Sequence, residues 1–318
     1  MLKTLVQKAY DHEEEQYLDL IRGLLEEGSF EKGRNGDTLC NIGSAMYFSL
    51  ENQRIPILTT KKVAMKTCLK ELLWFIRGNT NNQLLKDQNV HIWDLNGTKE
   101  FLESRGLPYE ENDLGPVYGH QWRHFNATYS SCHDDYSGFG VDQLQKVLDD
   151  LKNPETRSSR RHVISAWNPC QIDEMALPPC HVLFQFHVTR GNKLSCSLYQ
   201  RSGDVGLGVP FNIMSYAAFT ILVAKHCDLE PYEFIYYLGN THIYADHKEA
   251  LEEQITRTPH AFPTMTIKTK RDNINDYELD DFEIHDYVYH PPIKMNMSQW
   301  SAFLSLNQLN QIEYKQNQ

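Results

Sequence analysis

Apolar residues recur along the chain at two spacings, and each spacing predicts its own kind of element. Spacings of three and four residues indicate helices, which we expect over residues 1–28, 64–78, 141–151 and 212–227. Short apolar runs indicate strands, which we expect within 38–50, 182–188, 194–200 and 233–247. In the last segment we expect a strand, a turn and then His242 and Tyr244, whose side chains point the same way because they lie two residues apart.

Other stretches lack both spacings. Residues 31–37 are glycine-rich and predict a surface loop, and residues 290–297 predict an extended segment. Residues 90–125 alternate aromatic residues with Gly, Pro and charge, so we expect an irregular lobe that lines a cleft. The charged residues near the start of the chain predict a solvated helix face without a function.

The strands at 182–188 and 194–200 predict a β-hairpin with a reactive end. If the turn centres near Gly191, paired residue numbers sum to about 382, which places Cys180 opposite about Ser202 and beside Arg201. A guanidinium at that position favours the thiolate and predicts a lowered pKa for Cys180, as a sulfur nucleophile requires. For an arbitrary cysteine, a structural residue at a strand start is the commoner interpretation.

Three arginines are candidates for binding a phosphate. Arg160 and Arg161 precede a predicted strand and can present two planar forks to one dianion, although arginine pairs at such places are often solvated. Arg34 lies in the glycine-rich loop, where most residues serve only the turn.

Glu71 lies inside an apolar stretch of the predicted helix 64–78. A carboxylate near a core is costly to bury without a partner, so Glu71 is either a functional carboxylate or one half of a salt bridge. Trp93, Asn96, Tyr118 and Trp122 could all be packing residues, and for Trp122 packing is the preferred interpretation.

The composition narrows the class of protein. The chain has 318 residues, is 41% hydrophobic and carries a net charge of −11, which disfavours binding to nucleic acid or to anionic membranes. Seven cysteines without a C-x-x-C pair indicate free thiols rather than disulfides or a zinc site, and we expect no metal. The start turns acidic too soon for a secretory signal, and no apolar run approaches the length of a membrane span. We therefore expect a soluble intracellular protein, located in the cytoplasm or also in the nucleus.

Eight motifs follow one another in an order that resembles one family. They are LTTKKV, ELLWFIRGNTN, IWDLNG, GPVYGHQWRHF, the arginine pair before VISAWNP, MALPPCH, LSCSLYQRSGDVGLGVPFN and HIYADH. Together, from about residue 14 to about residue 297, they resemble thymidylate synthase, and the eukaryotic and viral members most closely. The resemblance implies an α+β fold with a large mixed sheet packed against helices, dimerising through the sheet. It also implies a catalytic domain over 1–297 and a C-terminal extension over 298–318, whose loosely spaced apolar residues would form a short amphipathic helix.

The resemblance implies reductive methylation of dUMP to dTMP, with 5,10-methylenetetrahydrofolate as co-substrate and dihydrofolate as product. Cys180 would add to C6 of the uracil, which makes C5 a nucleophile. Asn212 would read the uracil edge, Glu71 would act as an acid and base through ordered water, and Tyr118 would help to take the C5 proton. His181 follows the nucleophile without being its base. The alternatives are a dUMP or dCMP hydroxymethylase on the same scaffold, which Trp93 and Asn212 disfavour, and an impaired homologue with a binding role.

The resemblance also implies which residues bind the two substrates. The phosphate would be held by Arg201, Ser202 and Arg34 of one subunit and by Arg160 and Arg161 of the other, in an obligate homodimer. The other nucleotide-binding residues would be Gln200, Asp204, Asn212, His242 and Tyr244, the last two at the 3′-hydroxyl. The folate-binding residues would be Lys61, Ile92, Trp93, Asn96, Asp204, Leu207, Gly208, Phe211 and Met297.

The chain departs from the family pattern in three places. The loop at Arg34 is one residue shorter and carries Asp37 close to the expected dianion. The loop before Arg160 is longer, so that Arg157 could compete for its place. The chain continues to Gln318, whereas family members generally end two residues after the position of Met297 and close the site with their terminal carboxylate.

Overall fold

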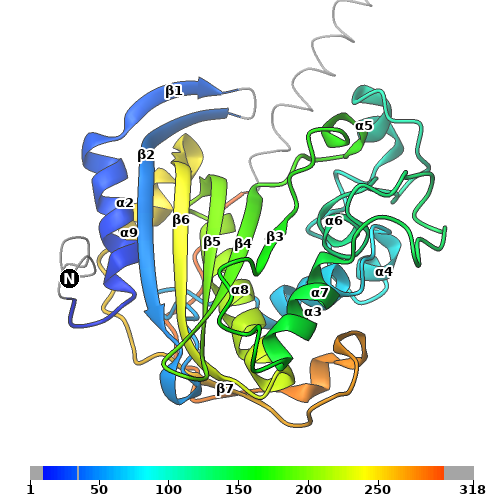
Figure 1. The fold of residues 1–318 in the computed structure, drawn as a ribbon. Coiled ribbons are helices and arrows are strands. Elements are labelled where there is room, and N and C mark those ends of the chain that lie inside the picture. The colour runs from blue at the N-terminus through cyan, green and yellow to red at the C-terminus, as the bar shows by residue number, and fades with distance from the viewer. Residues whose placement is uncertain (1–9, 34–35, 297–318) are drawn as a thin grey trace, which may run out of the picture.

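The centre of the protein is a six-stranded sheet in the order β1-β2-β6-β5-β4-β3, seen in a computed structural model that describes residues 10–33 and 36–296 (Figure 1). The pair β5–β6 is parallel and the other neighbours are antiparallel, so the sheet is mixed, as predicted. The strands are β1 (Ser29–Gly33), β2 (Gly36–Ser49), β3 (Val163–Ser165), β4 (His181–Thr189), β5 (Lys193–Asp204) and β6 (Glu230–Tyr244). A separate two-stranded sheet consists of β7 (Thr264–Ile267) and β8 (Phe282–His285).

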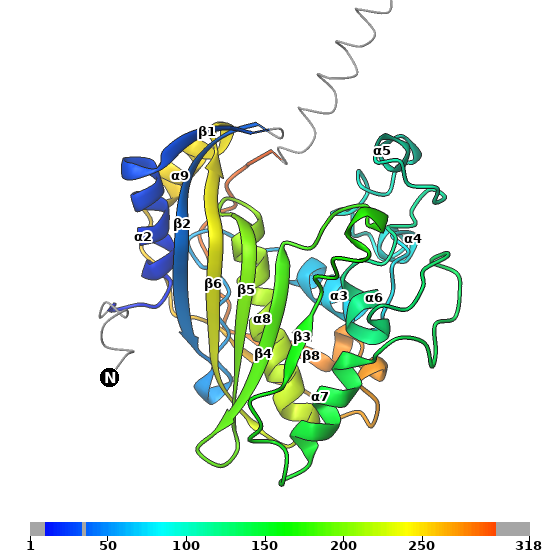
Figure 2. The ribbon, with the colours of Figure 1, turned by 45° about the horizontal axis from the view of Figure 1, so that its top comes forward.

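Helices pack against one face of the sheet and along one of its edges (Figures 1 and 2). They are α2 (Glu15–Glu27), α3 (Met65–Ile76), α4 (Gln83–Lys86), α5 (Lys99–Ser104), α6 (Tyr118–His124), α7 (Gln143–Lys152), α8 (Gly208–His226) and α9 (Lys248–Gln254). α8 lies against β5 and β6, α3 packs on α8, and α6 packs on α3. α2 lies beside β2 with α9 next to it, while α4, α5 and α6 belong to the irregular lobe on the other side of the molecule.

α8 is the core helix and is apolar all round, because it is enclosed by the sheet and by α3. It begins at Gly208, four residues before the predicted start, and takes Pro210 into its first turn. Proline is tolerated there because the first amides of a helix have no intrahelical acceptor. By length and composition α8 could cross a membrane, alone among the helices of the described residues, but 78% of its apolar window is buried inside the protein, as in a core helix.

The β4–β5 hairpin has the predicted register along most of its length. Leu183 pairs with Tyr199 and Thr189 with Lys193, as expected for a turn near Gly191. A bulge between His181 and Leu183 then shifts the ladder by one residue. As a result, the Arg201 amide donates to the Cys180 carbonyl at 2.9 Å, and Cys180 lies beside Arg201 rather than opposite Ser202.

Three predictions for the N-terminal region are wrong. The first helix begins at Glu15, since residues 10–14 form bends and turns, and residues 1–9 lie outside the described part. Its early acidic residues are not all solvated, because Glu14 is fully buried. Residues 31–37 are mostly strand: β1 and β2 pair up to Gly33 and Gly36, and Arg34 lies in the gap between the described ranges.

The segment 233–247 also differs from its prediction, because β6 continues through Gly239 and Asn240 without a turn. A Cβ on Gly239 would lie 2.8 Å from the Arg201 carbonyl oxygen. The glycine therefore permits a close approach between β5 and β6, not a reversal of the chain. Residues 290–296 have no regular structure, as predicted for an extended segment, and the extension 298–318 lies outside the described residues.

Candidate active site

Cys180 lies directly before β4, and its half-buried thiol is close to a guanidinium. Arg201 Nη2 is 3.9 Å from Cys180 Sγ. The same side chain donates from Nε to the Pro179 carbonyl at 2.9 Å and from Nη2 to the Pro178 carbonyl at 3.1 Å. Its guanidinium carbon also lies 5.6 Å from the ring centroid of Trp167, a contact that no sequence pattern indicated. Two carbonyls and one indole thus hold Arg201 against the thiol, and the predicted pairing is confirmed.

The net electrostatic effect on Cys180 is opposite to the predicted one. Burial raises the pKa of the Cys180 thiol, and Arg201 lowers it by less. A thiolate loses hydration in a half-enclosed site, and one guanidinium at 3.9 Å does not recover all of it. Arg201 therefore acts in the expected direction, but the prediction of a lowered pKa is wrong.

Tyr118 and His181 lie next to Cys180 and contact each other. The Cys180 amide donates to the Tyr118 hydroxyl at 2.7 Å, and the Tyr118 and His181 rings stack with centroids 4.0 Å apart. Burial raises the pKa of Tyr118 well above its ordinary value and lowers the pKa of His181 to about 3. His181 is therefore a neutral imidazole at neutral pH, bonded through Nδ1 to the Tyr216 hydroxyl at 2.8 Å. Such a ring cannot form an ion pair with a thiolate.

Glu71 is a buried carboxylate with an indole as its partner. Trp93 Nε1 donates to Glu71 Oε1 at 2.7 Å, and Glu71 forms no ion pair with a described Lys or Arg, so the salt-bridge interpretation is wrong. Burial raises the pKa of Glu71 to about 7, while the Trp93 hydrogen bond lowers it by less. The Trp93 and Tyr118 rings are 6.0 Å apart in an edge-on arrangement. One chain of contacts thus runs from Glu71 through Trp93 and Tyr118 to Cys180. Trp122 packs in the core, stacked on Phe219, as predicted.

The ends of β5 and β6 bring several predicted residues together. Gln200 is buried and accepts a hydrogen bond from the Tyr236 hydroxyl at 2.6 Å. Asp204 pairs with His242 on the neighbouring strand, and the His242 and Tyr244 rings lie edge to face at 5.3 Å. Burial raises the pKa of Tyr244 to about 12, with smaller contributions from Asp204 and Cys180. The shared orientation of His242 and Tyr244 is therefore confirmed, and both lie at the C-terminal end of β6.

A turn from β5 into α8 holds the predicted folate-binding residues. Asp204 Oδ1 accepts the Gly206 amide at 2.9 Å, and buried Lys61 donates to the Gly206 carbonyl. Burial lowers the pKa of Lys61 to about 8, and Asp204 opposes this shift. Asn212 is half-buried in the second turn of α8 and has no hydrogen-bond partner among the described side chains, so its amide is available to a ligand.

The remaining predicted residues are distributed as follows. Ser202, Ile92, Leu207, Gly208 and Phe211 are half-buried and Asn96 is buried, whereas Met297, like Arg34, is outside the described residues. Arg160 and Arg161 are exposed before the edge strand β3 and contact none of the Cys180 cluster within the described part of the chain. Arg157 donates to the Lys152 carbonyl at 3.1 Å.

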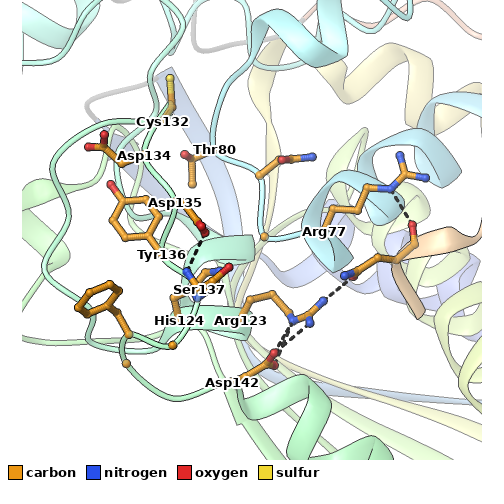
Figure 3. Close-up of a pocket in the computed structure, with 16 residues that line it drawn as sticks. Arg77, Thr80, Arg123, His124, Cys132, Asp134, Asp135, Tyr136, Ser137 and Asp142 are labelled. Carbon is orange, nitrogen blue, oxygen red and sulfur yellow. Dashed lines mark hydrogen bonds and ion pairs between the residues drawn. The ribbon is translucent and has the colours of Figure 1, made fainter. Parts of the chain in front are cut away.

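A polar cavity of about 560 Å³ lies apart from this cluster, between the ends of α3 and α6 and the loop at 132–140 (Figure 3). None of the predicted site residues lines it. Its arginines are already paired, Arg123 with Asp142 at 2.9 Å and Arg77 with Glu278 at 2.7 Å. Next to it, within the described residues, Glu110, Cys132 and His133 place metal-binding atoms within 4.8 Å of one another, again without a predicted site residue.

Comparison with known proteins assigns the chain to a family. The sequence profile of thymidylate synthase matches residues 15–299. The chain is 51% identical over 298 residues to thymidylate synthase of Saccharomyces cerevisiae, covering 90% of this chain and 97% of that protein. It is 50% identical over 291 residues to thymidylate synthase 1/2 of Encephalitozoon cuniculi, covering 90% and 98%. It is also 53% identical over 292 residues to the bifunctional dihydrofolate reductase-thymidylate synthase of Leishmania amazonensis, covering 91% of this chain and 56% of that one.

The chain belongs to the thymidylate synthase family, as the order of its motifs indicated. It spans little more than half the length of the bifunctional relatives. The match includes every described residue of the Cys180 cluster, from Glu71 to Tyr244.

Proposed function

We propose that this protein catalyses the reductive methylation of dUMP to dTMP, with 5,10-methylenetetrahydrofolate as co-substrate and dihydrofolate as the second product. The observation that carries the proposal is the Cys180 thiol with the Arg201 guanidinium 3.9 Å away, at the meeting point of β5, β6 and α8. The family and the near full-length match to two monofunctional relatives support the same activity.

In this proposal the Cys180 sulfur gives up its proton and forms a bond to C6 of the uracil. The C5–C6 double-bond electrons move through C5 and C4 onto O4, so that an enolate forms and C5 becomes nucleophilic. Arg201 stabilises the sulfur anion before the bond forms, when burial opposes it most. C5 would then bond to the one-carbon unit of the co-substrate and lose its proton, and the electrons of that C–H bond would expel the folate nitrogen and leave a methylene group on C5. A hydride from the co-substrate would reduce this methylene to methyl, the C5–C6 double bond would re-form, and the sulfur would leave C6 with the electrons of the C–S bond, giving dTMP and dihydrofolate.

Two buried groups are suited to the proton transfers. With a pKa of about 7, Glu71 is divided between its acid and base forms near neutral pH, which suits exchange through ordered water with the uracil O4. Tyr118 accepts the Cys180 amide through its hydroxyl oxygen, so its own proton remains available to a second acceptor. We propose that Tyr118 helps to take the C5 proton.

Nucleotide recognition would come from groups around the thiol. Asn212 offers one donor and one acceptor, which match O4 and N3–H of uracil, whereas cytosine presents the reverse pattern. His242 and Tyr244 would bond the 3′-hydroxyl from one side of β6. Arg201 and Ser202 would hold the phosphate, together with Arg34.

The folate, when bound, supplies the one-carbon unit and the hydride. The residues of the β5–α8 turn suit a pteridine, because Asp204 is half-exposed and its carboxylate can accept ring N–H donors. Trp93 lies beside Tyr118 with its ring edge-on to it, and it would line the folate site with its aromatic ring. Lys61, Ile92, Asn96, Leu207, Gly208, Phe211 and Met297 would complete the folate site.

We further propose that the protein acts as a homodimer, formed through the sheet face opposite α8. Tyr199 and Tyr237 are neighbours on this face and expose 42% and 40% of their surface. Apolar side chains gathered on a sheet face favour an interface. Arg160 and Arg161, exposed at the β3 edge, would then reach the phosphate site of the second subunit.

Replacing the nucleophile tests the proposed activity. Cys180→Ser should abolish release of tritium from C5-labelled dUMP and formation of dihydrofolate, because a serine hydroxyl is far less readily ionised than a thiol. Binding of dUMP, measured by calorimetry, should survive. The matched control is Cys170→Ser at an exposed thiol, which should leave both rates unchanged. Tritium release at the normal rate from Cys180→Ser would refute the proposal.

A further inference from the structure

Glu14 is a buried charged residue that the proposed chemistry leaves unexplained. It occupies the N-cap of α2 but does not cap that helix with its side chain. Its carboxylate instead accepts four donors: the Thr59 amide at 2.9 Å, the Thr59 hydroxyl at 2.6 Å, the Thr60 amide at 2.8 Å and the Thr60 hydroxyl at 2.7 Å. All four donors are neutral, and together they use both carboxylate oxygens. A fully buried carboxylate with this many donors orders the segment that supplies them.

The two threonines connect Glu14 to other parts of the chain. The Thr60 hydroxyl accepts from Gln254 Nε2 at 2.9 Å, and the Thr60 carbonyl accepts from Arg257 Nη1 at 2.8 Å. The Thr59 carbonyl accepts the His290 amide at 2.7 Å. The end of α9 and the start of the C-terminal segment therefore meet at the segment that Glu14 orders.

Lys61 follows Thr60 directly and connects this segment to the β5–α8 turn. Its buried ammonium donates to the Gly206 carbonyl. Gly206 is closely packed and leaves no room for a side chain, since a Cβ there would lie 2.5 Å from His247 Nδ1 and 3.2 Å from Met295 Sδ. The Gly206 and Leu207 amides in turn bond to Asp204 Oδ1 at 2.9 and 3.4 Å. A displacement of Lys61 thus reaches Asp204 through two consecutive contacts, Lys61 to Gly206 and Gly206 to Asp204.

We propose that Glu14 is a positioning residue for the folate side of the site: through Thr59, Thr60 and Lys61 it sets the place of the turn that carries Asp204 and Leu207. The expected change in the KM for the folate rests on the proposed function. The expected change in the position of the β5–α8 turn rests on the contacts alone. Glu14 contacts none of the Cys180 cluster among the described residues, so a change at Glu14 should affect the folate side of the site more than the nucleotide side.

The variant Glu14→Gln tests this assignment. Its side chain has the same shape, but its amide NH₂ must face at least one of the threonine N–H groups that the carboxylate accepted. We expect the KM for methylenetetrahydrofolate to rise about tenfold, as for the loss of one charge-assisted hydrogen bond. The dissociation constant for dUMP should stay within about twofold. Glu27→Gln, at an exposed position of the same helix, is the matched control and should change neither constant.

The route through Lys61 is tested by a double-mutant cycle. If Glu14 acts through Lys61, the double variant Glu14→Gln/Lys61→Met should raise the KM for the folate no more than Lys61→Met alone. Multiplication of the two single effects would overturn the route. A rise in the dUMP dissociation constant equal to the rise in the folate KM would overturn the assignment to the folate side. Thr60→Val removes one donor to Glu14 more gently, and serves if Glu14→Gln does not fold.

Hydrogen exchange separates this proposal from the proposed function. In Glu14→Gln the Gly206 and Leu207 amides should exchange faster than in the parent protein, whether or not the parent methylates dUMP. Unchanged exchange at these two amides would refute the positioning role. If the parent protein has no activity but the two amides exchange faster in Glu14→Gln than in the parent, the positioning role is supported and the enzyme assignment is rejected.

Discussion

At the scale of single residues, the site is built from groups whose burial works against their charge. Cys180 and Glu71 are both held more protonated than in water, one beside a guanidinium and the other beside an indole. For an acid and base this is useful, because a pKa of about 7 allows both roles near neutral pH. For the nucleophile Cys180, burial disfavours the thiolate, so Arg201 must offset part of the lost hydration.

The raised pKa of Glu71 predicts that the difference in unfolding free energy between Glu71→Gln and the parent protein depends on pH. Its pKa is about 7 in the folded protein against 4.5 for an ordinary glutamate. The stability that protonated Glu71 contributes is therefore complete below pH 4.5 and is lost as the pH rises through 7. Relative to the parent protein, Glu71→Gln should gain at most about 3 kcal/mol between pH 4.5 and pH 8, because Gln keeps an acceptor for Trp93 and carries no charge.

Urea unfolding of both proteins at pH 5 and pH 8 measures this gain, and turnover measures the accompanying loss of activity. A stability difference between the two proteins that is the same at both pH values would contradict the raised pKa. Glu26→Gln, at an exposed position on α2, is the control and should show no such change.

At the scale of elements, close backbone approaches position the catalytic side chains. Gly119, the second residue of α6, follows Tyr118 and faces the end of α3. A Cβ on Gly119 would lie 2.9 Å from the Phe75 carbonyl oxygen and 3.0 Å from that of Asn79. Because both neighbours are backbone atoms, α6 could accept a side chain there only by moving away from α3.

Gly119→Ala should therefore destabilise the protein by about 1–3 kcal/mol and lower kcat, since Tyr118 and its bond to Cys180 would move with α6. Gly23→Ala in α2 is the matched control, because its Cβ would meet nothing within 4 Å and its φ is negative. That variant should gain about 0.5–1 kcal/mol from helix propensity, with activity unchanged. Denaturant unfolding and steady-state rates test both, and equal stability of the two variants would contradict the packing argument.

At the scale of the whole molecule, one face of the sheet is covered by α8, on which α3 packs (Figure 1). The other face carries the exposed aromatic side chains of Tyr199 and Tyr237. The cluster around Cys180 lies where β5, β6 and α8 meet, whereas Arg160 and Arg161 lie beyond the edge strand β3. Within one chain the arginines contact none of the described cluster residues. A second chain packed on the open face would bring them to a phosphate site.

Mixing two inactive variants tests the shared site. Cys180→Ser and the double variant Arg160→Ala/Arg161→Ala should each be inactive alone. After unfolding and refolding together in equal amounts, half of the dimers would be mixed and each would contain one complete site, so about a quarter of the parent activity should return. If the arginines served their own chain, no mixed dimer would contain a complete site. A mixture without activity, at a dimeric mass by light scattering, would contradict the shared site.

Much of this organisation could be predicted from local sequence. The hairpin register followed from two strands and one glycine, and it placed Cys180 next to Arg201 to within a single bulge. The apolar stripe of α7 and the burial of α8 followed from spacing and composition. Such features depend on residues that are close in sequence, and the motifs that identify the family are equally local.

Tertiary structure alone decided the remaining features, including every strand pairing between segments far apart in the chain, because each depends on a contact between such segments. Glu71 meets Trp93, Glu14 meets Thr59 and Thr60, and Gly239 lies against the backbone of β5. The pKa of Cys180 depends on how deeply the folded protein encloses it, and no spacing of residues specifies that depth. The sequence by itself determined which groups are present and how the β4–β5 hairpin pairs, and the packed fold determined how strongly each group is desolvated and what it touches.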